Sequence, residues 1–165
     1  MSEITIRRFR AGEGDLLGQV LHRAVHEGTV GAYDEAQRMA WSPAPPQGPD
    51  WDARLTAGVT LVAWAGRDPA GFMTLLPGTG YLDLAYVSPD WQGQGVAAML
   101  CGLLERCALR QGLDRLSTDA SVLARRFFLK QGWQDGPRQD VTRHGVTLHN
   151  YRMARNLKPA LERAA

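Results

Sequence analysis

The sequence predicts a mixed α/β fold, in which a sheet of about seven strands is mostly antiparallel, contains one parallel pair and carries about four helices over both faces. Residues 59–87 form three strand-length apolar runs separated by turns that contain glycine, which is typical of an antiparallel meander. Residues 81–119 then run from a strand through a long helical pattern to a second strand. Such a step requires a parallel crossover, with its helix on one face of the sheet.

The other elements follow from the spacing of apolar residues and from residues that begin or end helices. ITIRRFR alternates as a strand does, and the apolar residues after Asp15 recur at helical spacing, with Asp15 as the N-cap. Gly112 and Gly132 each follow a helical run, where glycine commonly ends a helix. In chain order we predict a strand at 4–10, helices from 15 onward, at 34–41 and near 51–57, strands at 59–65, 72–77 and 81–87, a helix at 94–111, a strand at 114–119, a helix at 121–131, and two strands around the turn at 143–145.

Composition limits the class of protein. Hydrophobic residues make up 44% and charged residues 22% of the 165, which is ordinary for a globular chain and argues against disorder. We therefore expect a single domain over residues 1–165, with a core that needs no disulfide or metal. The 19 lysines and arginines are dispersed and the net charge is +2, so nucleic acid is not an expected partner, whereas an anionic small molecule stays open.

Localisation and redox state follow from what the sequence lacks. Its first ten residues hold no apolar leader, and no run of about 18 apolar residues occurs, so we expect neither a signal peptide nor a membrane span and a cytoplasmic location. Cys101 and Cys107 fall six residues apart in one helical pattern, too far apart to bridge each other. We expect both to be reduced thiols near the core.

The segment WQGQGVAAML at residues 91–100 places two glycines at the start of a long helix. A P-loop does not fit, because neither Lys-Ser nor Lys-Thr follows the second glycine. Gly93, Gly95 and Ala98 satisfy the dinucleotide pattern G-x-G-x-x-A, but SPDWQ separates them from the preceding strand, and three meander strands stand in place of a βαβ unit. The unpaired N–H groups of a helix N-terminus favour an anion, so a pyrophosphate cradle of another kind explains the segment better.

With its flanks, this segment resembles the hallmark of the GNAT superfamily of acyl-CoA-dependent N-acyltransferases. AYVSPDWQGQGVAAML contains the pattern Q/R-x-x-G-x-G/A, met by Gln92, Gly95 and Ala97. DASVLARRFFLKQGW resembles the later family motif, in which a strand opens into a helix that ends in a Gly-aromatic pair. IRRFR, YDEAQRMAWSP and HNYRM extend the likeness over nearly the whole chain, towards a bacterial branch of uncharacterised N-acetyltransferases. The resemblance implies a GNAT-like fold whose parallel central strands splay apart.

The resemblance also implies acetyl-CoA as co-substrate, with no metal, and assigns residues to each part of that molecule. The backbone of the strand at 85–87 pairs with the pantetheine amides, the glycine segment holds the pyrophosphate, and the helix after residue 121 lines the far side of the pantetheine. Lys130 or Arg125 meets the ribose phosphate. The residues so implied are Ala85, Tyr86, Val87, Gln92, Gly93, Gln94, Gly95, Val96, Ala97, Ala98, Ser121, Ala124, Phe127, Phe128 and Lys130.

The implied reaction is direct attack of an amine on the acetyl thioester in a ternary complex. The tyrosine that often serves the family as general acid is Phe128 here, so Tyr86 and Ser121 become the candidates for proton donation. Asp83 is the candidate base, because it is a carboxylate in an otherwise apolar strand; a structural partner for it is the alternative, and Asp119 is the competing base. By strand alternation, Asp83 is expected to share a face with Tyr81, Ala85 and Val87.

The amine acceptor is not identified by the sequence, and a small-molecule amine and a peptide amine both fit. In the family, acceptor specificity arises between the first two helices and in the last hairpin, where aromatic residues form either an apolar wall for a substrate or a packed loop. His22 and His26 have metal-ligand spacing without a third ligand, so we expect them to border the acceptor pocket. The expected acceptor residues are Tyr33, Trp41, Asp83 and His149, with Trp51 and His144 nearby.

Because Phe128 stands where the family often has a catalytic tyrosine, a second class of function also fits the sequence. A non-catalytic acyl-CoA sensor or interaction module of the same fold needs no general acid, and a nicotinamide-binding protein is a weaker third class. A monomer and a homodimer are both compatible with the sequence.

Overall fold

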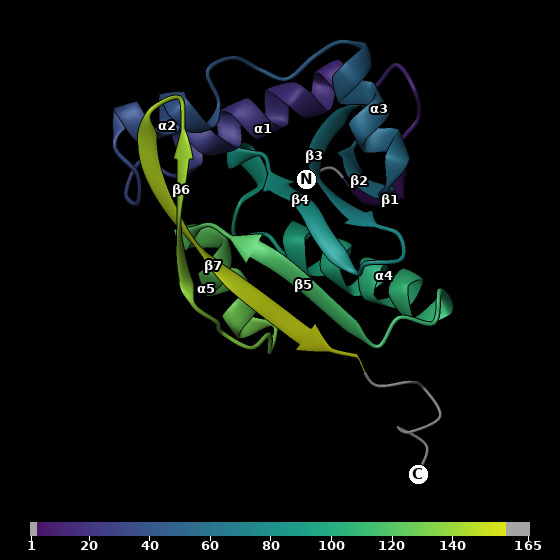
Figure 1. Ribbon diagram of the computed structural model, residues 1–165. Helices are drawn as coiled ribbons and strands as arrows, with labels where there is room; N and C mark the ends of the chain where they lie inside the picture. The colour runs from purple at the N-terminus through teal and green to yellow at the C-terminus, as the bar shows by residue number, and fades with distance from the viewer. Residues whose placement is uncertain (1–2, 158–165) are drawn as a thin grey trace.

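The computed structural model describes residues 3–157, which form one seven-stranded sheet in the order β1-β2-β3-β4-β5-β7-β6 (Figure 1). Neighbouring strands are antiparallel except β4 and β5, which are parallel. The predicted mixed sheet with one parallel pair is therefore confirmed. The strands are β1 (Ile4–Arg8), β2 (Val59–Ala65), β3 (Asp68–Leu76), β4 (Tyr81–Val87), β5 (Arg115–Ala120), β6 (Arg138–Arg143) and β7 (Val146–Asn156).

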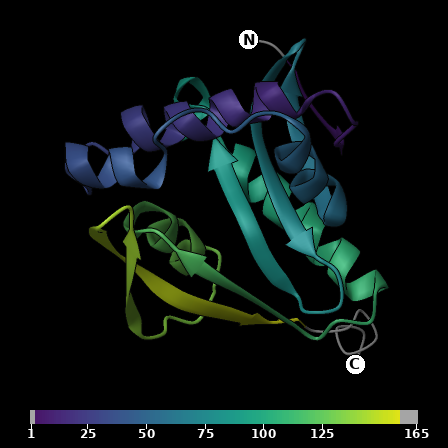
Figure 2. The same cartoon turned by 45° about the horizontal axis from the view of Figure 1, so that its top comes forward.

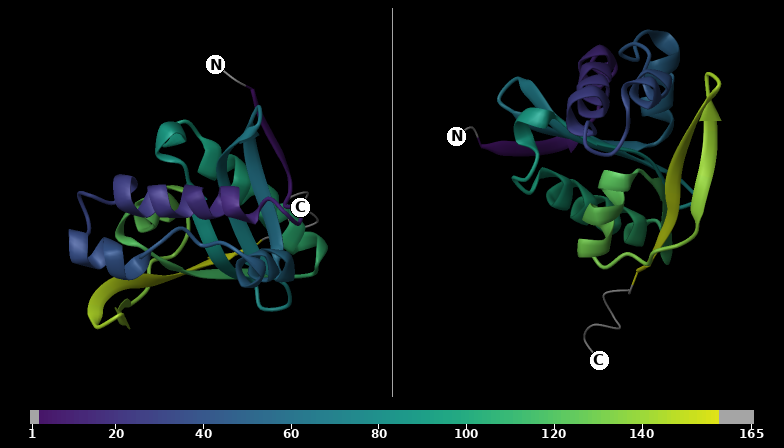
Figure 3. Two further views of the ribbon diagram at one scale, coloured as in Figure 1. Left: turned by 90° about the horizontal axis from the view of Figure 1, so that it is seen from above. Right: turned by 90° about the vertical axis from the view of Figure 1, so that its left-hand side faces the viewer.

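Helices cover both faces of this sheet (Figure 3). On one face, α1 and α3 pack around the fully buried Leu17, Leu55 and Phe72; on the other, α4 and α5 pack through Leu100 and Phe128. None of the helices within residues 3–157 is long and apolar enough to cross a membrane. The helices are α1 (Gly14–Gly28), α2 (Glu35–Trp41), α3 (Pro49–Ala57), the 3₁₀ helix η1 (Pro89–Trp91), α4 (Val96–Arg110) and α5 (Val122–Lys130).

β4 and β5 are paired only near the beginning of β4. Tyr81 pairs with Ser117 and Leu82 pairs with Thr118, and no further pair joins the two strands within the described part of the chain. At the end of this pairing the Thr118 hydroxyl donates to the Leu82 carbonyl oxygen at 2.9 Å. The strands then diverge, as the family resemblance implies (Figure 2). From residue 83 onward, the edge of β4 faces a gap.

A β-bulge in β4 lies where the divergence begins. On β3 the adjacent residues Thr74 and Leu75 pair with Leu84 and Leu82, so Asp83 is left without a pairing partner on β3. An extra residue of this kind breaks the simple alternation of side chains along a strand.

The bulge decides which face Asp83 occupies. Tyr81, Asp83 and Tyr86 all border a cavity on the face of α1, whereas Ala85 and Val87 pack towards α4 on the opposite face. The expectation that Asp83 shares a face with Ala85 and Val87 was therefore wrong, because it rested on uninterrupted alternation.

The start of α1 differs from the prediction in the residue that caps it. The helix begins at Gly14 with Glu13 at the N-cap position, and the Glu13 carboxylate binds Arg7 at 2.6 Å. Asp15 was the expected cap, but its carboxylate accepts a hydrogen bond from the Gly48 backbone N–H at 3.2 Å. Asp15 thus holds the loop before α3 instead of capping its own helix.

Two histidines attach α1 to the segment that follows α2. His22 Nδ1 lies 2.8 Å from Ser42 Oγ, and His26 Nε2 lies 2.7 Å from the Ser42 carbonyl oxygen. Their ring centroids are 4.3 Å apart. Within residues 3–157, no group of three or more His, Cys, Asp or Glu side chains is placed to hold a metal ion. Burial, and secondly the neighbouring His26, lower the pKa of His22.

Acid is expected to destabilise the fold through His22. Its pKa in the folded chain is below the value of about 6.5 for an unperturbed histidine, so the unfolded state binds the proton more tightly. The free energy of unfolding then falls as the pH drops below about 6.5. We expect the thermal unfolding midpoint of the wild type to fall more steeply between about pH 7 and 5 than that of His22→Gln.

The matched control is His144→Gln, on the exposed turn between β6 and β7, which should keep the wild-type pH dependence. An unchanged pH dependence in His22→Gln would contradict the assignment.

Candidate functional site

Two cavities lie on opposite faces of the sheet, where β4 and β5 diverge. The first, of about 470 Å³, lies on the face of α1, and we call it the aromatic cavity. The second, of about 520 Å³, is lined by the starts of α4 and α5, and we call it the helix-end cavity. Among the described residues, Ser121 alone lines both. The aromatic cavity takes its name from Tyr33, Trp41, Trp51, Tyr81 and Tyr86.

The glycine turn forms one wall of the helix-end cavity. Because η1 separates β4 from this turn, the chain does not pass directly from strand to helix as it does in a dinucleotide-binding turn. Gly93 and Gly95 have φ angles of 75° and 83°, which glycine adopts without strain. For this reason α4 begins at Val96 and not at residue 94, and no side chain caps it. The first N–H groups of α4 are thus available to an anion.

The rest of the helix-end cavity is an apolar slot. Phe128 borders it but is otherwise enclosed, with its ring 4.5 Å from that of Trp133. No tyrosine within residues 3–157 lines this cavity. From β4 and α5, the slot is lined by Ala85, Val87, Ala124 and Phe127.

Three residues expected to bind acetyl-CoA lie outside the helix-end cavity. Lys130 and Gln94 are exposed and do not line it, and the Tyr86 side chain faces the aromatic cavity instead. Arg125, the alternative to Lys130, forms an ion pair with Asp135 and also lies outside the lining. The expected residues that do line the helix-end cavity are Ala85, Val87, Gln92, Gly93, Gly95, Val96, Ala97, Ala98, Ser121, Ala124, Phe127 and Phe128.

Tyr33 joins three elements at the back of the aromatic cavity. Its hydroxyl donates to the His149 carbonyl oxygen on β7 at 3.1 Å and accepts from the Val122 N–H of α5 at 3.0 Å. Burial raises the pKa of Tyr33, so the phenol stays neutral. The Trp41 ring packs edge-on against it at 5.4 Å. The structure therefore brings Tyr33, Trp41 and His149 together, as expected for one pocket.

Tyr86 of β4 lines the same cavity and contacts Trp41, the last residue of α2. The Trp41 indole N–H donates to the Tyr86 hydroxyl oxygen at 3.3 Å. Burial raises the pKa of Tyr86, which keeps this phenol protonated. Its own O–H remains able to donate into the cavity.

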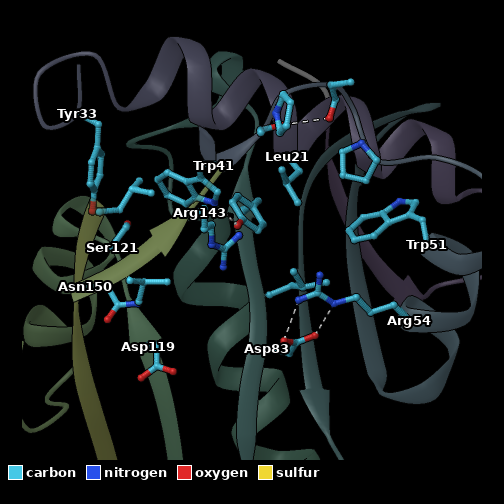
Figure 4. A pocket seen from close by; sticks show the side chains of 18 of the residues that line it. Leu21, Tyr33, Trp41, Trp51, Arg54, Asp83, Asp119, Ser121, Arg143 and Asn150 are labelled. Atoms are coloured by element: carbon cyan, nitrogen blue, oxygen red, sulfur yellow. Dashed lines mark hydrogen bonds and ion pairs between the residues drawn. The ribbon is translucent and has the colours of Figure 1, made fainter. Parts of the chain in front are cut away.

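Asp83 faces the aromatic cavity and binds Arg54 of α3 (Figure 4). Arg54 Nε donates to Oδ2 at 2.9 Å and Nη2 donates to Oδ1 at 3.0 Å. The hydrogen bonds to Asp83 raise the pKa of Arg54. The structural partner that the sequence left open for Asp83 is therefore present. Each carboxylate oxygen accepts one bond from Arg54, which leaves a lone pair on each for a further donor.

Asp119, the competing base, is more fully occupied. It accepts from the Tyr81 hydroxyl at 2.7 Å and from Gln139 Nε2 at 2.9 Å, and it forms an ion pair with Arg152 at 3.2 Å. Burial, together with the bond to Asp119, raises the pKa of Tyr81 to about 12. Three partners leave Asp119 with fewer free lone pairs than Asp83 for a further hydrogen bond.

Ser121 is the N-cap of α5 and stands where the two cavities meet. Its Oγ accepts from the Ala124 N–H at 3.1 Å, which positions the hydroxyl at the helix start. The hydroxyl hydrogen is not used by this cap and can be donated to a ligand at the junction.

Sequence reasoning missed Arg54 and Arg143, which both line the aromatic cavity. Asp83, an acidic residue in an apolar strand, indicated a cationic partner. The residues around Arg54 gave no sign that it, and not another arginine, is this partner. His144, expected near the acceptor, lies at the exposed hairpin turn with a φ of 48° and does not line the cavity. Trp51 does line it, and its indole N–H donates to the Gly14 carbonyl oxygen at 2.7 Å.

Comparison with known sequences finds one family model and several relatives. The model, described as an acetyltransferase (GNAT) domain, matches residues 48–155. YafP of Escherichia coli K12, called an uncharacterised N-acetyltransferase, is 28% identical over 153 residues, which are 93% of this chain and 96% of YafP. YjaB of Salmonella typhimurium LT2, called a peptidyl-lysine N-acetyltransferase, is 31% identical over 143 residues, which are 84% of this chain and 88% of YjaB.

Solved structures show the same fold. A crystal structure of a GCN5-related N-acetyltransferase from Rhodopseudomonas palustris has a TM-score of 0.88 and 31% identity, over 95% of this chain and 98% of that one. PaiA N-acetyltransferase from Thermoplasma acidophilum, solved in complex with coenzyme A, has a TM-score of 0.73 and 16% identity, over 93% and 99% of the two chains. Because the family model spans α3 to β7 and these relatives match most of the chain, the chain belongs to the GNAT family of N-acetyltransferases.

Proposed function

We propose that this chain moves an acetyl group from acetyl-CoA to a primary amine by direct attack, with both substrates bound at once. The observation that carries the proposal is the position of Ser121 at the border of both cavities. A thioester at this border can be reached by an amine that occupies the aromatic cavity. Holding both reactants in this arrangement makes the reaction effectively unimolecular.

The helix-end cavity suits the donor. The uncapped start of α4 offers N–H groups to a pyrophosphate, and the absence of Cβ atoms at Gly93 and Gly95 allows close approach. The apolar slot between Val87 and Phe127 suits the pantetheine arm. The β4 edge beyond Leu82, which is not paired with β5, suits the amides of that arm as an added strand would.

The bond changes where the two cavities meet require only one hydrogen-bond donor from the protein. The amine nitrogen bonds to the acetyl carbon, the carbon–sulfur bond breaks, the nitrogen gives up its extra proton to water, and the sulfur leaves as a thiolate. Ser121 donates a hydrogen bond to that sulfur, which later takes a proton from water. A thiolate stabilised in this way needs no phenol, which reconciles Phe128 with catalysis.

Asp83 is proposed to accept the proton that the incoming ammonium must lose. It lies in the aromatic cavity with accepting capacity left on both oxygens, whereas Asp119 already has three partners. Tyr86, with its neutral phenol in the same cavity, is proposed to orient the acceptor by donating to it.

Phe128 is the observation that favours a second candidate, a non-catalytic acyl-CoA sensor. Calorimetry with acetyl-CoA and a thiol assay of coenzyme A release with a panel of primary amines separate the two. Amine-dependent release supports the transferase. Tight binding without release on any amine favours the sensor, and failure to bind acetyl-CoA contradicts both.

Asp83→Asn is expected to lower kcat by about 100-fold or more and to leave the KM for acetyl-CoA unchanged, because it removes a proton acceptor. The fold should tolerate the change, since Arg54 is half exposed and can be solvated. Asp119→Asn is the matched comparison and should retain more activity. A folded Asp83→Asn protein with wild-type kcat across the pH range removes Asp83 from the mechanism.

Ala98→Glu is expected to raise the KM for acetyl-CoA at least about tenfold, because it brings a negative charge to the proposed pyrophosphate site. The same charge in the first turn of α4 is favourable for the helix, so the thermal midpoint should not fall. Ala98→Gln adds nearly the same bulk without charge and should have the smaller effect. Equal KM values for the two variants would place the pyrophosphate elsewhere.

A further inference from the structure

The aromatic cavity contains an arginine, Arg143, whose charge is not neutralised by any residue in 3–157. Its lining includes two arginines and two aspartates. Asp83 is paired with Arg54, and Asp119 with Arg152 from outside the cavity. The guanidinium of Arg143, the last residue of β6, forms no ion pair or side-chain hydrogen bond with any residue in 3–157, although its backbone pairs with Val146. Figure 4 shows its guanidinium beside Trp41, directed into the space that Asn150 and Asp83 also face.

Two neutral donors face the same space without an acceptor. The Tyr86 oxygen accepts from Trp41, while its own O–H has no acceptor among the described residues. The Asn150 carbonyl oxygen accepts from Gln139 at 3.0 Å, and its amide N–H₂ has no acceptor in the described part of the chain. Both residues line the cavity with Arg143. A guanidinium together with two neutral donors is the complement of a carboxylate.

Part of the remaining wall is apolar, and the cavity volume restricts the size of the ligand. Trp41, Trp51, Leu21, Pro46 and Leu84 form this part, and a volume of about 470 Å³ is in the range of small-molecule sites. A lysine side chain of a peptide would bring its amine and an aliphatic stem, but no carboxylate of its own for Arg143.

We propose that the acceptor is a small amine that also carries a carboxylate, such as a free amino acid with an apolar side chain, and that Arg143 binds this carboxylate. Tyr86 and Asn150 complete the anion site, and the side chain of the acceptor lies against Trp41 and Trp51. This inference rests on the proposed acetyl transfer and specifies the substrate class of the same site.

The test compares amines that differ only in the carboxylate. Initial rates of coenzyme A release are measured for L-phenylalanine against 2-phenylethylamine, for L-tryptophan against tryptamine, and for L-methionine against 3-(methylthio)propylamine. Nα-acetyl-lysine methylamide serves as the peptidyl-lysine probe. We expect kcat/KM to be about 10- to 100-fold higher for the amino acid of at least one pair, which is the range of a charge-assisted hydrogen bond.

Arg143→Gln should abolish this preference by raising the KM for the amino acid much more than the KM for the matching amine, and it should not alter the KM for acetyl-CoA. Arg138→Gln is the matched control, because Arg138 is an exposed arginine of the same strand that does not line the cavity. Both variants should fold, since neither side chain is buried.

The possible failures are distinguishable. Turnover of the lysine probe or of the carboxylate-free amines at least as fast as of every amino acid would overturn the inference and leave acetyl transfer intact. An amino-acid preference that survives Arg143→Gln would overturn the role of Arg143. Absence of coenzyme A release with every amine tested would instead contradict the proposed acetyl transfer.

Discussion

The divergence of β4 from β5 after two residue pairs is the constraint on which both cavities depend. If these strands stayed paired, the sheet would separate its two faces completely. Because pairing ends at Leu82 and Thr118, the faces communicate, and α5 begins at Ser121 on the border of the opening. The same divergence leaves backbone groups of β4 that need hydrogen-bond partners. An extended ligand between the strands can supply them.

The bulge at Asp83 sets which residues of β4 face each cavity. After the extra residue, Ala85 and Val87 serve the helix-end cavity, while Asp83 and Tyr86 serve the aromatic cavity. One short strand thus contributes to both sites at the point where they meet. The ion pair between Asp83 and Arg54 links this strand to α3. A helix that does not line the helix-end cavity therefore holds an aspartate of the aromatic cavity in place.

The parts of the structure that could be predicted are those encoded by contiguous residues. The glycine turn before α4 and the helix from Ser121 to Gly132 are local motifs, and the residues expected from them to bind the donor line the helix-end cavity, with the exceptions of Gln94 and Lys130. The antiparallel meander and the one parallel pair followed from the order of element types and from the crossover that a strand-helix-strand step requires. These inferences need only local spacing and general rules of topology.

The parts that could not be predicted depend on pairs distant in sequence. Asp83 meets Arg54 across 29 positions, and the face it occupies depends on a bulge that apolar alternation does not reveal. Arg143 ends a strand whose residues are mostly exposed, so its hydropathy pattern is that of an ordinary edge strand. Its place in a cavity arises only when the last hairpin lies opposite α2.

The location of the cavities on opposite faces also has a kinetic consequence. Under the proposed assignment, the acceptor occupies the cavity on the face of α1 and the donor the cavity at the starts of α4 and α5, so the binding of one does not require that the other bind first. A bisubstrate inhibitor that occupies both cavities has to pass beside Ser121. The part of the inhibitor that joins the donor sulfur to the acceptor nitrogen then has to be its narrowest part. The width of the opening beside Ser121, more than the size of either cavity, would then limit how bulky the joined molecule can be.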